Sequence, residues 1–187
     1  MIVSLLRAAI PTFAKPGVVT PDFDVTAYHH VPTVTFASAV HVAVVDVDRD
    51  TGSVKLVRYV VAHDCGKVIN PFIAMADMEG SFMQSFQVAT NAIPYDKEFP
   101  GQMHSNIAFL SFPIPTIMEF PDELEQVFIE SLEPRWFYGY KGFSETSIGS
   151  VPGAIGNAIY NAIGVRVSHP ISAERILMAL KKRREVV

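Results

Sequence analysis

The chain has 187 residues, of which 49% are hydrophobic and 18% are charged, and its formal net charge is −4. This much apolar material excludes a disordered chain and suffices for one domain, or two small ones, with a hydrophobic core. The acidic balance disfavours a dedicated nucleic-acid-binding protein, because phosphate contacts require a basic surface.

Residues 1–35 contain several prolines and other turn-forming residues, which predicts a connecting segment with one short helix over residues 2–9. The domain proper is expected to span residues 36–187. Its first predicted element is a β-hairpin, because residues 36–48 and 53–63 both alternate apolar with small or polar residues and a tight Asp-Thr-Gly turn separates them.

A long helix is predicted over residues 72–93, where bulky apolar side chains recur at helical spacing. Pro71 stands where a first-turn proline is tolerated. Gly80 lies inside this helix, and a glycine at such a position indicates that another backbone or a ligand approaches closely. A further strand is expected over residues 125–133.

The last third of the chain begins with an aromatic and glycine-rich stretch, residues 134–153, which is expected to be a loop. A helix of small residues is predicted over residues 152–163, closed by Gly164, and a last helix over residues 173–184. The basic run at residues 181–184 is expected to complete the last turn of that helix, where cations offset the helix dipole. Strands and helices without strict alternation predict an α+β fold.

The sequence does not predict a metal site. It has no H-x-x-x-H pair and only one cysteine, and His63 with Cys65 supplies two ligands where zinc needs at least three from the protein. The lone cysteine also excludes an intrachain disulfide and is typical of a reducing compartment. Since there is no apolar stretch of about 20 residues and no signal-peptide pattern, a cytoplasmic chain without a membrane span is expected.

Two catalytic interpretations of the aromatic loop remain open. Residues 142–146 resemble, one residue short, the G-x-S-x-G turn of a hydrolase nucleophile, with Ser144 as the serine and His169 as the one downstream histidine. Alternatively, Glu145 is a general base held among small residues that let a bulky ligand approach the backbone. Aromatic walls around it would disfavour its ionised form, as a base working near neutral pH needs.

Four blocks of sequence, in order, resemble the molybdenum hydroxylase family, which includes xanthine dehydrogenases, aldehyde oxidases and aerobic carbon monoxide dehydrogenases. Residues 60–71 (VVAHDCGKVINP) resemble the strand-to-helix segment near the C terminus of the large molybdopterin-binding subunit, and residues 78–84 resemble its helix with G-x-x-x-Q. Residues 139–145 (GYKGFSE) resemble its G-x-K-G-x-G-E loop, and residues 157–166 its closing helix and strand. The resemblance implies an α+β domain with a mixed sheet and packed helices.

The same resemblance implies roles for individual residues. Glu145 aligns with the family's catalytic general base, in the oxidation of an electron-poor carbon with water as the oxygen source. Gln84 and the backbone of Gly142, Phe143 and Ser144 match positions that face the molybdopterin cofactor. The family's [2Fe–2S] and FAD centres are expected on other subunits or domains, because one cysteine cannot build an iron–sulfur site.

The sequence departs from the family pattern next to these residues. Ser144 replaces the glycine before the glutamate, and its hydroxyl either narrows the approach or offers a hydrogen bond. The pair after the glutamate is Thr146-Ser147, and Ser85 and Gln87 replace glycines of the family's helix, which puts close packing there in question.

The family's catalytic subunit is several times longer than this chain. We therefore expect a fragment or small subunit that does not turn over alone, that associates with the remainder of the molybdopterin-binding subunit and with iron–sulfur and flavin subunits, and that tends to oligomerise through exposed apolar surface. The substrate class stays open between N-heterocycles, aldehydes and carbon monoxide. The alternative is a truncated, non-catalytic paralogue that acts as a scaffold or interaction module.

Overall fold

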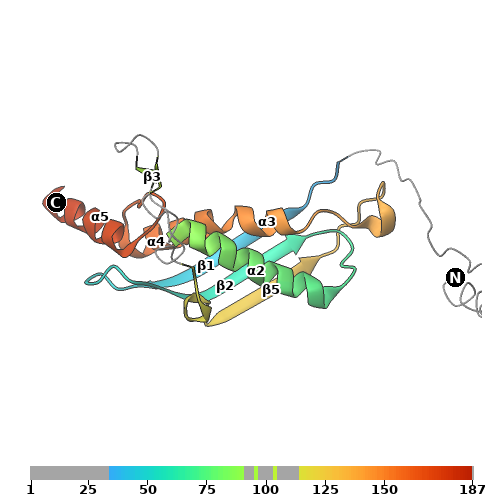
Figure 1. Ribbon diagram of the computed structural model, residues 1–187, viewed down its shortest axis with the longest axis horizontal. Coiled ribbons are helices and arrows are strands. Elements are labelled where there is room, and N and C mark those ends of the chain that lie inside the picture. The colour runs from blue at the N-terminus through green and yellow to red at the C-terminus, as the bar shows by residue number, and fades with distance from the viewer. Residues whose placement is uncertain (1–33, 91–94, 97–102, 105–113, 187) are drawn as a thin grey trace, which may run out of the picture. The chain divides into compact units, whose positions relative to one another are not determined.

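The computed structural model describes residues 34–90, 95–96, 103–104 and 114–186 (Figure 1). The strands are β1 (Ser38–Val47), β2 (Val54–Asp64), β3 (Tyr95–Asp96), β4 (Met103–His104) and β5 (Glu123–Ile129). The helices are α2 (Pro71–Thr90), α3 (Ser144–Gly149), α4 (Val151–Ile163) and α5 (Ala173–Val186), with 3-10 turns η2 (Ile117–Glu119) and η3 (Phe137–Gly139). The predicted connecting segment and its short helix fall almost wholly on residues 1–33, outside the described residues, and the domain boundary at residue 35 stays a prediction.

The predicted hairpin is confirmed. β1 and β2 pair antiparallel along their whole length, with one register shift between Val44 and Val45. The carboxylate of Asp48 accepts a hydrogen bond from the backbone amide of Asp50 at 2.8 Å, and Gly52 takes a left-handed φ of 75°. Both features are typical of tight turns. Aspartate bonds to the backbone amide two residues on, and glycine adopts a positive φ without steric cost.

The three-stranded sheet is mixed. Its order is β1-β2-β5, and β5 runs parallel to β2. Parallel neighbours need a crossover connection, and α2 lies in that connection, packed along the sheet (Figure 1). The α+β class and the mixed sheet are thus confirmed, although β5 begins at Glu123 and ends at Ile129, earlier at both ends than predicted.

The hydrophobic core lies between this sheet and the helices. β2 contributes Tyr59 and Val61, both at most 1% exposed, and the helices contribute a continuous layer of large apolar side chains. The helical members of the core are Met78, Phe82 and Phe86 of α2, Val151, Ile155, Ile159 and Ile163 of α4, and Ile176 and Leu180 of α5. Their spacing along each helix is the three-to-four residue spacing that predicted these helices.

The opposite face of the sheet is bare within the described part of the chain. Val40, Val42 and Val44 of β1 are 66%, 52% and 47% exposed, and Val127 and Ile129 of β5 are 40% and 49% exposed. The register places Val40 beside Ala62 and Ala62 beside Val127, so one apolar row crosses all three strands. We call Val40, Val42, Val44, Val127 and Ile129 the bare sheet face.

The C-terminal helices agree with the sequence, with one correction. α4 ends at Ile163 and is closed by Gly164 at φ 71°, as predicted, and the basic run lies in the last turns of α5. The expected loop over residues 134–153, however, contains α3. A helix of six residues is too short for hydrophobic periodicity to reveal, and its cap residue, Phe143, makes no side-chain capping hydrogen bond. None of the helices that the structure describes combines the length and apolarity needed to cross a bilayer.

Candidate functional site

The candidate site is a cavity of about 370 Å³ at the end of the molecule where β2 passes into α2. Three segments form it: the loop at residues 65–70, the first turns of α2, and the approach to α3. It is lined by Cys65, Lys67, Val68, Ile69, Asn70, Ile73, Ala74, Asp77, Tyr140, Lys141, Phe143 and Ser144. Two blocks that the sequence singled out, residues 60–71 and 139–145, therefore meet in one place.

An ion pair joins these two blocks. The ammonium Nζ of Lys141 lies 2.8 Å from Oδ2 of Asp64, and the two side chains are only 11% and 18% exposed. Oδ1 of Asp64 accepts hydrogen bonds from the backbone amides of Gly66 and Ser131, at 3.0 and 3.2 Å. Burial would raise the pKa of Asp64, but the hydrogen bonds from Lys141 and the two amides outweigh it and hold that pKa below its ordinary value. Asp64 is thus ionised and fully engaged, a structural clamp.

Backbone contacts reinforce the clamp. The amide of Lys141 donates to the carbonyl of Cys65 at 2.7 Å, and the amide of Lys67 donates to the carbonyl of Gly139 at 3.1 Å. Gly66 and Gly139 both have left-handed φ, at 66° and 75°. A methyl group on Gly66 would collide with the Gly139 carbonyl, so glycine is required where the two chain segments cross.

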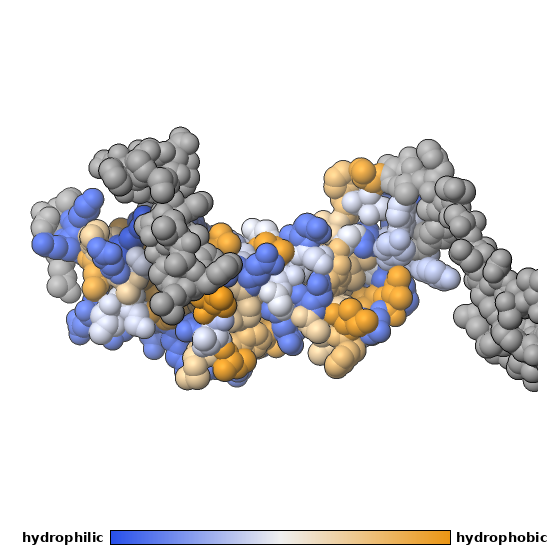
Figure 2. All heavy atoms as spheres, viewed as in Figure 1, coloured by the Kyte–Doolittle hydropathy of each residue, from blue (hydrophilic) through white to orange (hydrophobic). Residues whose placement is uncertain are grey.

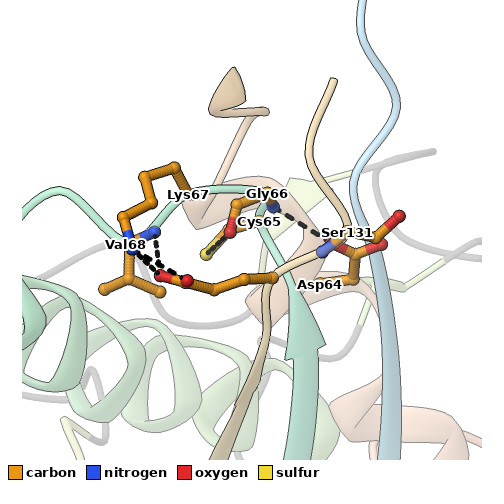
Figure 3. A network of polar contacts seen from close by, with 7 residues as sticks. Asp64, Cys65, Gly66, Lys67, Val68 and Ser131 are labelled. Atoms are coloured by element: carbon orange, nitrogen blue, oxygen red, sulfur yellow. Dashed lines mark hydrogen bonds and ion pairs between the residues drawn. The ribbon is translucent and has the colours of Figure 1, made fainter. Parts of the chain in front are cut away.

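A second carboxylate organises the outer side of the loop (Figure 3). Glu130 accepts from Lys67 Nζ at 2.8 Å and from the backbone amide of Val68 at 2.9 Å. The pKa of Glu130 is lowered, first by the Lys67 hydrogen bond and then by the Val68 amide. Asn70 closes the loop by accepting from the Ile73 amide at 3.2 Å, which caps the start of α2.

Cys65 lines the cavity as a neutral thiol. It is 4% exposed, and burial raises its pKa above the ordinary value. A thiol of raised pKa is a poor nucleophile and a poor metal ligand at neutral pH. No cluster of three or more histidine, cysteine or carboxylate side chains able to hold a metal occurs among the residues that the structure describes.

Three side-chain contacts fix α3 beside the cavity. The hydroxyl of Ser144 donates to Oδ2 of Asp77 at 2.8 Å, and the hydroxyl of Ser85 donates to the carbonyl of Ile148 at 2.7 Å. Ser147 lies 3.3 Å from Nδ1 of His63. Among the departures from the family pattern, Ser85 and Ser144 thus supply side-chain hydrogen bonds that a glycine lacks.

The rings beneath α3 form an apolar layer that contains the buried His63 and the partly buried His41. Phe143 packs on His63 with ring centroids 4.5 Å apart and on Phe128 at 6.2 Å. His41 bonds the hydroxyl of Tyr59 at 2.9 Å. Burial lowers the pKa of both histidines, and the nearby His63 lowers that of His41 further. Both rings are therefore neutral at pH 7.

Glu145 stands in the first turn of α3 with its side chain exposed. The expectation of aromatic walls around it is not met by the described residues, because Phe143 turns inward and Tyr138 is 83% exposed. The carboxylate is open to solvent on a rigid support. Any enclosure of Glu145 must therefore be supplied from outside the described residues.

The remaining predicted site residues divide into two groups. Phe143 and Ser144 line the cavity, whereas Gln84, Gly142 and Glu145 do not and are exposed. Gly142 has open space where a Cβ would stand, which suits close approach of a ligand to the backbone. Gly80 also faces open space, so none of the described residues packs closely on it, and the approach of a ligand or another backbone there stays a prediction.

No catalytic triad that would support the hydrolase interpretation occurs among the residues that the structure describes. The described hydrogen bond of the Ser144 hydroxyl goes to the carboxylate of Asp77, and His169 lies 3.3 Å from the carbonyl of Ala89 instead. A serine nucleophile needs an imidazole base within hydrogen-bond reach. The arrangement around Ser144 is one of support for α3.

The sequence did not predict the residues that hold the cavity loop and α3 in place. Asp64 and Lys141 stood inside the quoted blocks, and their opposite charges were the signal for a pair. Asp77 carried no signal, because its role depends on how α2 packs against α3. The contact of Glu130 with Lys67 likewise could not be predicted, because it depends on the pairing of β5 with β2.

Comparison with known proteins adds a family. A family model described as the molybdopterin cofactor-binding domain matches residues 7–121 of the chain. The large chain of carbon monoxide dehydrogenase from Hydrogenophaga pseudoflava is 28% identical over 173 residues, which cover 89% of this chain and 21% of the relative. A nicotinate dehydrogenase subunit from Pseudomonas putida is 34% identical over 145 residues, covering 77% of this chain and 12% of the relative.

Solved structures of molybdenum enzymes are similar to this chain. The crystal structure of a Cu,Mo-CO dehydrogenase in its carbon monoxide reduced state superposes with a TM-score of 0.76 at 26% identity, over 94% of this chain and 22% of that chain. The chain thus spans about a fifth of the length of the carbon monoxide dehydrogenase large chain that it matches.

Proposed function

The chain belongs to the molybdopterin cofactor-binding family of molybdenum hydroxylases, and from this premise we propose that it supplies the general base and one wall of the cofactor site in such an enzyme. The observation that carries the proposal is the placement of Glu145 on α3, a short helix held by three side-chain contacts beside a cavity that two family motifs form.

The cavity suits a bulky, anionic, hydrogen-bonding cofactor. Its two lysines, Lys67 and Lys141, are paired with carboxylates. Its one lining carboxylate, Asp77, accepts a hydrogen bond from Ser144. Neutral groups, such as the side-chain amide of Asn70, therefore remain as donors in the lining. Gly142 leaves room for close approach to the backbone beside the cavity. Neutral donors aimed by a rigid frame are the usual means of orienting a cofactor.

Molybdopterin, when bound, supplies the two-electron redox chemistry of the reaction. The contribution of this chain is a base that accepts a proton. Glu145 is suited to this because three side-chain contacts, two with α2 and one with β2, anchor its helix. Its carboxylate is thus held in place without being used in an ion pair among the described residues. The Ser144–Asp77 hydrogen bond orients the first turn of α3 and acts on Glu145 as a positioning contact.

The rest of the site comes from a larger partner, which we propose is the remainder of the molybdopterin-binding subunit. Apolar surface surrounds the cavity mouth, where Ile69, Phe72 and Ile73 are 65%, 81% and 62% exposed. Figure 2 shows apolar surface gathered toward this end of the molecule. Together with the bare sheet face, this patch is the kind of exposed apolar surface that a partner covers. Enclosure of Glu145 would then complete the site, and the isolated chain would not turn over.

The proposed substrate is a small molecule with an electron-poor carbon. The relatives' names include carbon monoxide and nicotinate dehydrogenases, so the class spans carbon monoxide and N-heterocycles, with aldehydes as a third member. Iron–sulfur and flavin centres on other subunits would carry the electrons away from the site.

The test is to purify the tagged chain from its native source and analyse the metal and the proteins that accompany it. We expect molybdenum together with a larger pterin-binding partner. In that assembly, Glu145→Gln should retain molybdenum and lower turnover by about 10²–10⁴-fold, the usual contribution of a general base. Glu174→Gln, which removes an exposed carboxylate of α5, is the matched control and should leave turnover unchanged.

Two results would count against the proposal. Full activity of the Glu145→Gln assembly would remove the glutamate from the reaction. A chain that purifies without molybdenum and without a pterin-binding partner would favour the alternative, a non-catalytic scaffold or interaction module that retains the fold.

A further inference from the structure

A second cavity, of about 560 Å³, is lined by the segment that follows α4 and by side chains of α5. Figure 1 shows α5 at the opposite end of the domain from the start of α2. None of its lining residues lines the first cavity. They are Gly164, Val165, Arg166, Val167, Ser168, Arg175, Met178, Ala179, Lys182 and Arg183. Its volume is within the range of small-molecule sites, roughly 300–1,000 Å³.

The lining is cationic without compensation. Arg166, Arg175, Lys182 and Arg183 contribute four positive charges, and the described lining residues include no aspartate or glutamate. None of the ion pairs formed between residues that the structure describes involves any of the four. This is unusual in a chain with a net charge of −4, and it concentrates a positive potential in one hollow.

Neutral acceptors hold the three arginines in place. Arg166 donates to the side-chain oxygen of Asn157 at 2.6 Å, and its guanidinium carbon lies 4.5 Å from the centre of the Tyr160 ring. Arg175 donates to the carbonyl of His169 at 2.8 Å, and Arg183 donates to the carbonyl of Ile163. Such contacts immobilise a guanidinium without cancelling its charge, and most of its five N–H donors remain for a ligand.

This chemistry selects the ligand. Planar guanidinium forks match phosphate oxygens in pairs, and a prepositioned fork loses little entropy on binding. Between the cations the lining is apolar, with Val165, Val167 and the 54% exposed Met178. We propose that this cavity binds a phosphorylated small organic molecule, with its phosphate on the arginines and its organic part on the apolar side chains. This inference is independent of the proposed function, since it shares no residue with the first cavity.

The test is calorimetric titration of the full chain with ADP, inorganic pyrophosphate and a polyglutamate peptide at low and moderate salt. We expect ADP to bind, more tightly than pyrophosphate, with an affinity that falls as salt rises. The double variant Arg166→Gln/Lys182→Gln should weaken ADP binding by about tenfold or more, since each charged hydrogen bond is worth that order. Lys182→Gln alone touches none of the fixed arginine contacts and should weaken binding in the same direction.

The matched control is Lys55→Gln/Arg135→Gln, which removes the same charge from exposed ion pairs elsewhere. It should leave ADP affinity within about twofold, because both control cations are paired with exposed carboxylates and neither lines the cavity. Equal weakening by the control variant, or no binding of any probe, would overturn the site. Equal affinity for pyrophosphate and ADP would overturn the role of the apolar side chains, and binding of the peptide alone would replace a small molecule with an acidic protein segment.

Discussion

The two cavities of this domain treat charge in opposite ways. Around the first, Lys141 is paired with Asp64 and Lys67 with Glu130, and the charges serve to hold two chain segments together. Around the second, neutral groups hold the three arginines, and none of the four cations forms an ion pair among the described residues. Paired charges build a frame on which neutral donors and a base can be placed, whereas unpaired charges attract an anion directly.

Breaking the ion pair between Lys141 and Asp64 at the first cavity should have the largest effect on stability. Lys141→Met leaves Asp64 mostly buried without its cation, and we expect the free energy of unfolding to fall by about 3 kcal/mol. Chemical denaturation measures this change. Lys55→Met, which breaks the exposed pair with Asp122, is the control and should cost less than about 1 kcal/mol.

The double variant Asp64→Asn/Lys141→Met sharpens the same point. Replacing both partners removes the uncompensated charge, so most of the lost stability should return. Equal losses in Lys141→Met and Lys55→Met would show that the Asp64–Lys141 pair does not join the two segments.

The two histidines beneath α3 predict that the stability of the fold depends on pH. Burial lowers the pKa of His63 and of His41 in the folded chain, whereas in the unfolded chain both titrate near about 6.5. Below that pH the unfolded state binds more protons, so stability is fully present above about pH 6.5 and falls as the pH drops toward the folded-state values. Unfolding curves at pH 7, 6 and 5 measure the slope.

A matched variant isolates the histidines. His41→Gln/His63→Gln should flatten the profile between pH 7 and 5, where the carboxylates with lowered pKa do not yet titrate. A wild-type stability that does not change across this range would contradict neutral histidines under α3.

The smallest effect is expected from giving the second cavity the carboxylate that it lacks. Met178→Glu places an acid among four cations, and we expect a gain of about 0.5 kcal/mol, the size of an exposed ion pair. ADP binding should weaken at the same time, because the new carboxylate competes for the arginines. Unchanged stability together with unchanged ADP affinity would show that the cations do not act on the cavity.

Local patterns were sufficient for most elements of the fold. The hairpin, α2, α4 with its Gly164 cap, and α5 follow from alternation, helical spacing and turn residues, since each of these signals lies within a few positions of the element it specifies. The α3 helix could not be found this way, because its stability comes from Ser85, Asp77 and His63, which lie 63 to 84 residues from the groups that they contact. Four motifs, read as a family resemblance, named Glu145 and its neighbours.

Amino-acid order alone thus specified most of the elements, the family resemblance and the residue proposed as the base. Tertiary structure decided the rest: which carboxylates Lys67 and Lys141 meet, and that Glu145 stands exposed on a helix. It also decided that, among the described residues, one sheet face is uncovered and four cations gather without an acid. The physical reason is the distance along the chain over which each interaction acts. Periodicity and turn preferences act between near neighbours in the chain, whereas pairing of charge, burial and exposure depend on segments that only the folded chain brings together.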